Sequence, residues 1–213
     1  MAELFASNLV KICGVTTLGD ANAAIDAGAN AIGFILAKSP RQLSFERALA
    51  LAAATSGRIV RTVVFDDSDD AFILSALDVI DADVVQIHGE LRQELLSALR
   101  ARDLKVVKAL AIGSEEFFTF DARSVDAVLV DGARPGSGET HSWADLAQRS
   151  FGVPVIAAGG LTSENVRAVI ATTGAWGVDT ASGVESSPGV KDRVVMRQFI
   201  ETAHRAFDER GAS

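Results

Sequence analysis

Short apolar runs recur along the chain, separated by longer segments in which polar residues dominate. The runs span residues 9–13, 31–36, 59–65, 84–88, 105–110, 127–131, 153–160 and 176–182. Runs of about four to eight residues rich in Val, Ile, Leu and Ala are typical of buried parallel strands. The pattern therefore predicts eight strands.

The segments between these runs carry helical spacing, and several begin with Ser or Thr, which favour the cap position of a helix. The clearest are residues 16–29, 44–56, 92–103, 162–174 and 192–210, whereas 114–124 and 142–150 have weaker patterns. Strands that alternate with helices predict an α/β protein, and eight such pairs predict a single (β/α)₈ TIM barrel over residues 1–213. An open, doubly wound sheet is the alternative.

Composition and charge narrow the class of partner. The 213 residues are 48% hydrophobic and carry a formal net charge of -8. An acidic protein repels nucleic acid and anionic membranes, so neither is expected as a partner, although local donors can still hold a small phosphorylated ligand. One cysteine, no long apolar segment and no secretion signal indicate a soluble, cytoplasmic protein, with a monomer as the default.

Polar side chains interrupt the predicted strands near their carboxyl ends. Side chains alternate along a strand, so Lys11 shares a face with Cys13, and Gln86 with His88, while Asp131 closes the run 127–131. In a parallel barrel the active site lies at the carboxyl ends of the strands. Cys13, His88 and Asp131 are therefore candidates for the mouth of the barrel.

These residues also have purely structural interpretations. A lone cysteine is commonly a small buried apolar residue, and an aspartate after a strand commonly forms a turn or caps a helix. Lys11, Lys108 and Asp179 could form a buried layer of charges, since the first and last strands of a barrel are neighbours.

Barrel geometry favours a chemical role for Cys13 and Asp131. Eight strands about 4.8 Å apart and tilted about 36° place the ends of the first and sixth strands roughly 14 Å apart. Side chains that reach inward from both leave a gap about the size of one sugar. A thiolate can take a proton from carbon there while a carboxylic acid gives one to oxygen. We predict that Lys11 favours the thiolate, as neighbouring cations do.

Glycine-rich loops follow the last three predicted strands. Gly159 and Gly160 lie in "AAGGLTSENV", and "DTASGVESSPGVKD" follows the eighth strand. Backbone NH groups exposed by glycine at helix amino ends bind phosphate, and the loops after strands 7 and 8 are a common place for it in barrels. The loop "PGSGETHSW" after the sixth strand is interpreted as a lid.

Arg41, after the second strand, has the forked guanidinium that suits a carboxylate, although a lone loop arginine is commonly surface. The His, Cys, Asp and Glu residues show no metal-ligand spacing, and no P-loop, G-x-G-x-x-G or G-x-S-x-G motif is present.

Over nearly its whole length the chain resembles the phosphoribosylanthranilate isomerase family. The matching pieces, in order, are "VKICGVT", "IGFILAKSPRQLS", "VVQIHGE", "VLVDG", "PGSGETHSW", "AGGLTSENV" and "GVDTASGVESSPGVKD". The resemblance implies an Amadori rearrangement of N-(5-phosphoribosyl)anthranilate, a step of tryptophan biosynthesis, in one barrel without metal or cofactor.

The resemblance also implies roles for individual residues. Cys13 would be the general base and Asp131 the general acid, and Arg41, Gln86 and His88 would bind substrate. The phosphate loops would contain Gly159, Gly160, Ser182 and Gly183. The chain departs from the family pattern at Pro135-Gly136 and His141-Ser142, in the predicted lid.

Two other functions stay open. A related phosphosugar isomerase or epimerase would share the barrel, but indole-glycerol-phosphate synthase chemistry would need a catalytic lysine at a strand end, where Lys108 is poorly placed. A catalytically idle barrel that only binds a phosphorylated ligand would keep its affinity after Cys13→Ala.

Overall fold

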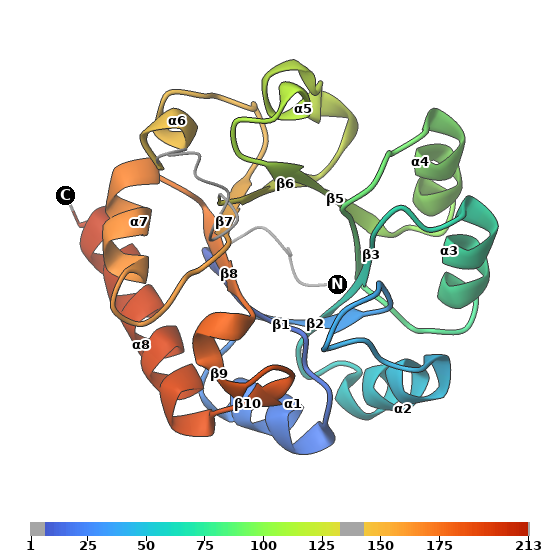
Figure 1. The fold of residues 1–213 in the computed structure, drawn as a ribbon, viewed down its shortest axis with the longest axis horizontal. Coiled ribbons are helices and arrows are strands. Elements are labelled where there is room, and N and C mark those ends of the chain that lie inside the picture. The colour runs from blue at the N-terminus through green and yellow to red at the C-terminus, as the bar shows by residue number, and fades with distance from the viewer. Residues whose placement is uncertain (1–6, 133–142, 213) are drawn as a thin grey trace.

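Eight parallel strands close into a barrel in the computed structural model, which describes residues 7–132 and 143–212. Each strand pairs with the next along the chain, and β1 pairs with β8 through Lys11 and Asp179. Figure 1 looks into this ring, with the helices outside it. The predicted (β/α)₈ barrel is confirmed, and the open sheet is wrong because the first and last strands are bonded to each other.

The strands of the barrel are β1 (Leu9–Cys13), β2 (Ala31–Ile35), β3 (Val60–Phe65), β4 (Val84–Ile87), β5 (Lys105–Ala111), β6 (Ala127–Asp131), β7 (Val155–Ala158) and β8 (Gly177–Thr180). The helices are α1 (Leu18–Asp26), α2 (Phe45–Thr55), α3 (Asp70–Leu77), α4 (Gln93–Arg100), α5 (Glu115–Thr119), α6 (Trp143–Ala147), α7 (Val166–Thr173) and α8 (Arg193–Gly211). Two 3₁₀ turns, η1 (Ala122–Ser124) and η2 (Ser182–Val184), are also present.

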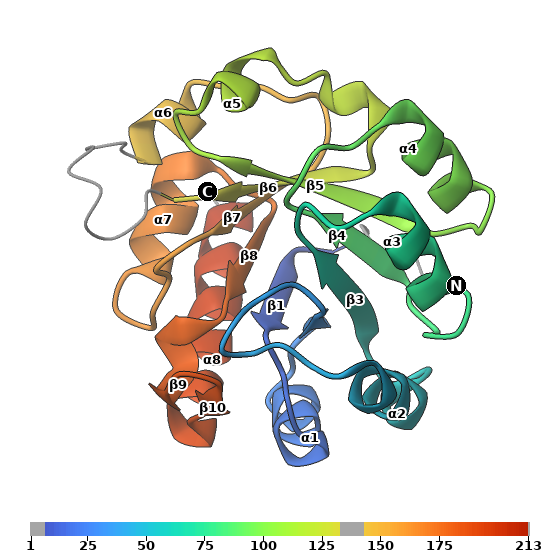
Figure 2. The same cartoon turned by 45° about the vertical axis from the view of Figure 1, so that its right-hand side comes forward.

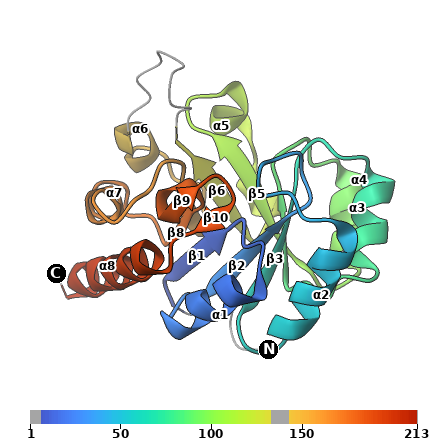
Figure 3. The ribbon, with the colours of Figure 1, turned by 60° about the horizontal axis from the view of Figure 1, so that its bottom comes forward.

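The structure corrects the predicted elements at two places. Strand β4 ends at Ile87, so His88 lies in a loop, whereas β7 ends at Ala158 and the two glycines follow it as predicted. An antiparallel hairpin of β9 (Glu185–Ser187) and β10 (Val190–Lys191) separates β8 from α8. The sequence did not predict this hairpin because its strands are too short to show an alternating pattern. Figure 3 shows it next to the start of α8.

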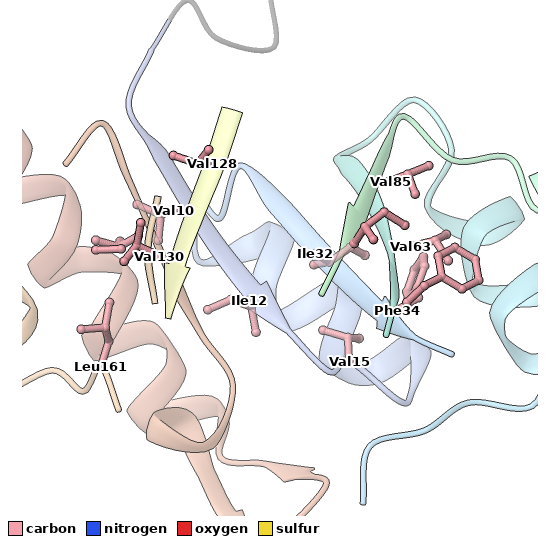
Figure 4. Close-up of a cluster of buried hydrophobic side chains, with 14 of the residues drawn as sticks. Val10, Ile12, Val15, Ile32, Phe34, Val63, Val85, Val128, Val130 and Leu161 are labelled. Carbon is pink, nitrogen blue, oxygen red and sulfur yellow. The ribbon is translucent and has the colours of Figure 1, made fainter. Parts of the chain in front are cut away.

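Alternation along each strand divides the apolar residues into two layers. In β1, Val10 and Ile12 are fully buried and point outward, into the helix-facing cluster that also contains Phe34 and Val63 (Figure 4). Figure 2 shows α3 and α4 covering the outer side of β3, β4 and β5. The buried apolar residues that form a cluster inside the barrel are Leu9, Ala31, Val84, Val107, Ala109, Ala127, Leu129, Ile156 and Ala158.

Side-chain caps fix where several helices begin. Thr17 accepts a hydrogen bond from the backbone NH of Asp20 at α1, and Ser44 accepts one from Arg47 at α2. Each cap satisfies a backbone NH group that has no partner within its helix. The strand-to-helix turns above the barrel are therefore set locally by the sequence. No helix among the described residues combines the length and apolarity that crossing a bilayer requires.

Candidate active site

The carboxyl ends of the strands surround a cavity of about 1040 Å³, a volume that includes its opening to solvent. The lining residues are Cys13, Ile35, Arg41, Val64, Gln86, His88, Leu129, Asp131, Gly132, Ala158, Gly159, Gly160, Asp179, Ala181 and Ser182. The structure therefore brings together every predicted site residue except Gly183, which lies beside Ser182 in η2 but does not line the cavity.

Cys13 shares one wall of the cavity with a buried ion pair. The Nζ atom of Lys11 lies 2.9 Å from Oδ2 of Asp179, and both side chains are at most 7% exposed. A Cβ atom on Gly33 would lie 2.8 Å from Sγ of Cys13 and 3.3 Å from Nζ of Lys11. The glycine in β2 therefore provides the room in which the thiol and the ammonium group meet.

Burial raises the pKa of the Cys13 thiol, and the nearby ammonium group of Lys11 lowers it by less than burial raises it. The predicted effect of Lys11 on the thiol is thus confirmed in direction, and burial outweighs it. Burial also raises the pKa of Asp179, against the effect of Lys11. Because their charged atoms are 2.9 Å apart, we treat Lys11 and Asp179 as an ion pair.

The expected pairing of Lys11 with Asp179 is confirmed, but Lys108 does not belong to it, so the layer of three charges is wrong. Register pairs Gln86 with Val107 and Ile87 with Lys108, and it is Gln86 that lines the cavity. Lys108 therefore points outward, where its Nζ atom lies 2.8 Å from Oε2 of Glu116 in α5.

Asp131 is the last residue of β6, three strands from β1 around the ring, and lines the cavity. A Cβ atom on Gly159 would lie only 2.2 Å from Oδ1 of Asp131 and 2.6 Å from the backbone nitrogen of Gly132. Gly159 also has a φ of +90°, which favours glycine. The loop after β7 therefore contacts the carboxyl group directly, and only glycine fits there.

Gln86 and His88 lie between Cys13 and Asp131 around the wall of the cavity. Nε2 of Gln86 is 2.7 Å from Nε2 of His88, and Gln86 is only 2% exposed. Burial, followed by the positive charges of Lys11 and Lys108, lowers the pKa of His88 to about 4. The shift favours a neutral imidazole ring at pH 7.

Arg41 lies beside Cys13 and is held by a carboxylate that the sequence analysis did not identify. Its Nε and Nη2 atoms each donate a hydrogen bond of 2.7 Å to Glu185. A Cβ atom on Gly14 would lie 2.4 Å from Cδ of Arg41, so the arginine stem lies against the backbone directly after Cys13. Arg41 is thus part of the site rather than free surface.

The two predicted phosphate loops, after β7 and β8, meet at the cavity. The loop after β8 does not lead directly into the long helix α8, as the sequence predicts. The amino end of α8 is capped by Asp192, whose carboxylate accepts from the backbone NH groups of Val194 and Val195. The loop after β8 leads instead into η2, where a Cβ atom on Gly183 would lie 1.8 Å from the carbonyl oxygen of Leu161. The helix that directly follows this loop is therefore η2, and no residue of α8 lines the cavity.

The predicted lid, with its departures at Pro135-Gly136 and His141-Ser142, lies outside the described residues. Within those residues, no group of three or more His, Cys, Asp and Glu side chains is placed to hold a metal ion. Two residues of the site were missed as functional. Asp179 was interpreted only as a structural charge, and Glu185 lies in the unpredicted hairpin, so no strand-end signal marked it.

Comparisons with known proteins give a consistent result. The family model described as "N-(5'phosphoribosyl)anthranilate (PRA) isomerase" matches residues 10–202. An N-(5'-phosphoribosyl)anthranilate isomerase of Beijerinckia indica is 37% identical over 92% of this chain and 94% of its own length.

Solved structures of similar proteins agree with the barrel. The phosphoribosyl anthranilate isomerase of Thermotoga maritima has a TM-score of 0.83 at 32% identity, covering 93% of this chain and 99% of that one. A phosphoribosyl anthranilate isomerase in complex with reduced 1-(o-carboxyphenylamino)-1-deoxyribulose 5-phosphate has a TM-score of 0.80 at 30% identity, with coverage of 93% and 99%.

Proposed function

This chain belongs to the N-(5'-phosphoribosyl)anthranilate isomerase family and is an isomerase enzyme of tryptophan biosynthesis. We propose that Cys13 and Asp131 catalyse its reaction and that the other residues of the cavity bind the substrate. The reaction is the Amadori rearrangement of N-(5-phosphoribosyl)anthranilate to 1-(2-carboxyphenylamino)-1-deoxyribulose 5-phosphate. The observation that carries the proposal is that Cys13 and Asp131 line one cavity from β1 and β6, three strands apart in the ring.

Asp131 acts first, as the general acid. It gives its proton to the furanose ring oxygen, the bond from that oxygen to C1 breaks, and the anthranilate nitrogen forms a Schiff base with C1. The open chain then presents its C2 hydrogen to the opposite wall. A positioned acid of this kind contributes about 10²- to 10⁴-fold to the rate.

Cys13 acts second, as the general base. Its thiolate takes the proton from C2, the electron pair of the C–H bond forms a C1–C2 double bond, and the Schiff base becomes a neutral enolamine. A proton then returns to C1 as the C2 hydroxyl becomes a carbonyl, which completes the rearrangement. Because burial raises the pKa of this thiol, only a minor fraction of the free enzyme holds the thiolate at neutral pH.

The remaining residues orient the substrate. Arg41 binds the anthranilate carboxylate, and Gln86 and His88 contact the sugar between the two catalytic residues. Gly159, Gly160, Ser182 and Gly183 provide the phosphate site. In the described turns, loops and caps, the NH groups of Gly160, Ser182 and Gly183 donate to no backbone carbonyl, which supports their availability for a phosphate.

Turnover of the proposed substrate is the test. Freshly prepared N-(5-phosphoribosyl)anthranilate should lose its fluorescence when the purified chain is added, because the anthranilate nitrogen changes its substituent. Lack of turnover, with retained binding of a phosphorylated ligand after Cys13→Ala, would favour the idle barrel instead. Synthase chemistry that needs a lysine is disfavoured because Lys108 points away from the cavity towards Glu116.

A further inference from the structure

Glu185 lies at the centre of a buried network on the rim of the cavity. Its side chain is only 4% exposed, and Oε1 is 2.7 Å from Nε of Arg41 and 2.9 Å from Nζ of Lys191. Lys191 also donates a hydrogen bond of 2.8 Å to the carbonyl oxygen of Ala181, next to Ser182. The network thus joins the arginine beside Cys13 to the loop after β8.

The contacts with Glu185 use one edge of the guanidinium group. Oε1 accepts from Nε of Arg41 and Oε2 from Nη2, each at 2.7 Å, which is the bidentate geometry of a planar fork with a carboxylate. A guanidinium has five N–H donors, so three remain. They lie on Nη1 and Nη2, and among the described residues none of them has an acceptor. The free edge is therefore the one that a second carboxylate would occupy.

The surroundings hold Arg41 in this orientation. The stem of Arg41 lies against Gly14. The turn of the β9–β10 hairpin lies close to Pro40, the residue before Arg41, because a Cβ atom on Gly189 would be 2.9 Å from the carbonyl oxygen of Pro40. The carbonyl of Gly189 in turn accepts a hydrogen bond of 3.2 Å from the hydroxyl of Thr16. The hairpin is thus fastened to the loops after β1 and β2, and it carries Glu185.

The charges of the network favour one anion. Arg41 and Lys191 carry two positive charges and Glu185 carries one negative charge, which leaves one positive charge at the cavity. Although burial raises the pKa of Glu185, hydrogen bonds from Arg41 and Lys191 outweigh it and lower that pKa, so Glu185 is ionised at neutral pH. One substrate carboxylate would make the group neutral.

We propose that Glu185 is a positioning residue, which holds the Nε–Nη2 edge of Arg41 so that the outer edge is fixed towards the cavity for the anthranilate carboxylate. The inference rests on the proposed function, and specifically on Arg41 as the carboxylate site. Glu185 touches none of the reacting atoms. It acts on the affinity for the carboxylate and leaves the proton transfers unchanged.

The opposite role would be competition, in which Glu185 occupies Arg41 until the substrate displaces it. The two roles predict opposite signs. Glu185→Gln keeps the shape of the side chain but loses the charge, so a competitor would become weaker and KM would fall. If Glu185 positions Arg41, the Glu185→Gln variant would no longer hold the guanidinium group in place. KM would then rise, although the loss of the carboxylate makes the network more positive.

The test measures KM and kcat for Glu185→Gln. We expect KM to rise about tenfold, the value of one charge-assisted hydrogen bond, with kcat within about twofold of wild type. Glu185→Asp, which keeps the charge but shortens the reach, should also raise KM. In an Arg41→Ala background, Glu185→Gln should no longer raise KM. An equal rise in both backgrounds, or an unchanged or lower KM in the wild-type background, would overturn the proposal.

Asp83→Asn is the matched control, because Asp83 accepts from Nε and Nη2 of Arg61 at 2.9 Å each, before the amino end of β4. This variant loses a similar forked pair away from the cavity and should leave KM unchanged.

A binding measurement separates the failure of this inference from the failure of the proposed function. Glu185→Gln should weaken calorimetric binding of reduced 1-(o-carboxyphenylamino)-1-deoxyribulose 5-phosphate about tenfold, and leave binding of the analogue without the carboxylate unchanged. Equal weakening of both compounds would overturn the inference alone. If wild-type protein neither binds these compounds nor turns over the substrate, the proposed function fails and takes the inference with it.

Discussion

The two ends of the barrel hold similar forked ion pairs between an arginine and a carboxylate, but they differ in how many of the other arginine donors have an acceptor. At the amino end, Arg61 donates through Nε and Nη2 to Asp83 and through Nη1 to Asp81. At the carboxyl end, Arg41 uses the same two atoms for Glu185, and within the described residues its remaining donors have no acceptor. The amino end satisfies its arginine within the chain, whereas the carboxyl end leaves donors for a ligand.

The space inside the barrel shows the same contrast. The space in the amino half, about 320 Å³ including its opening to solvent, is lined mainly by apolar side chains such as Leu9, Val60 and Ile156. The cavity at the carboxyl end is lined by a thiol, carboxyl groups, an imidazole and a guanidinium. Buried polar groups cost stability unless they are paired. Concentrating them at one end confines that cost to the place where chemistry needs them.

The largest expected effect is on stability, from removing the cation of the buried pair. Lys11→Met leaves Asp179 buried without its partner, so the free energy of unfolding should fall by about 3–5 kcal/mol in denaturant titrations. Arg61→Met at the amino end should cost less, because Asp81 and Asp83 are 67% and 31% exposed and can be hydrated. Equal losses of unfolding free energy for Lys11→Met and Arg61→Met would contradict the claim that the two ends differ in how well a partnerless carboxylate is hydrated.

The next effect is on catalysis, and it uses the two ends of a single strand. Asp131→Asn, at the carboxyl end of β6, should lower kcat at least about 10²-fold, because an amide cannot give the proton. Asp126→Asn, just before the amino end of β6, removes a carboxylate 3.0 Å from Lys105 and should leave kcat unchanged. Near-normal turnover by Asp131→Asn would refute its role as the acid.

A smaller effect on kcat is expected from Gly159→Ala, since the new Cβ would lie 2.2 Å from Oδ1 of Asp131 and displace the acid. The expected loss is about tenfold, below the cost of a fully misplaced group. Gly152, with a φ of +71°, has open space where its Cβ would be. Gly152→Ala should therefore share the backbone strain, about 1 kcal/mol, without the loss of activity. If both variants lose activity equally, strain rather than displacement is responsible.

The smallest effect is a shift in titration. Because burial raises the pKa of Cys13, the thiol binds its proton up to a higher pH than an exposed cysteine does. The rate of alkylation by iodoacetamide should therefore rise with pH to a midpoint above that of glutathione measured in parallel. A midpoint below that of glutathione would mean that Lys11 outweighs burial.

The strands and the gathering of the site could be predicted because both follow from alternation. An inward-facing side chain at the carboxyl end of a barrel strand points into the mouth of the barrel. Cys13 and Asp131 were placed at the cavity on that basis, and His88 was too, although it follows β4 instead of ending it.

The partners of these residues could not be predicted, because they depend on contacts between distant segments. Glu185 reaches Arg41 across 144 positions of the chain, from a hairpin with no periodic pattern. The net pKa of Cys13 depends on how much burial opposes Lys11, which spacing along the chain does not reveal. The outward direction of Lys108 follows from the register of β5, which the sequence leaves undefined.

The central claim is that the thiol of Cys13 removes the C2 proton of the bound sugar. The most direct measurement follows the release of deuterium into water from substrate labelled at C2, for wild-type protein and for Cys13→Ser. The account predicts release at least about 10²-fold slower in the variant, with binding of the reduced product analogue retained. Release at the wild-type rate by Cys13→Ser would contradict it.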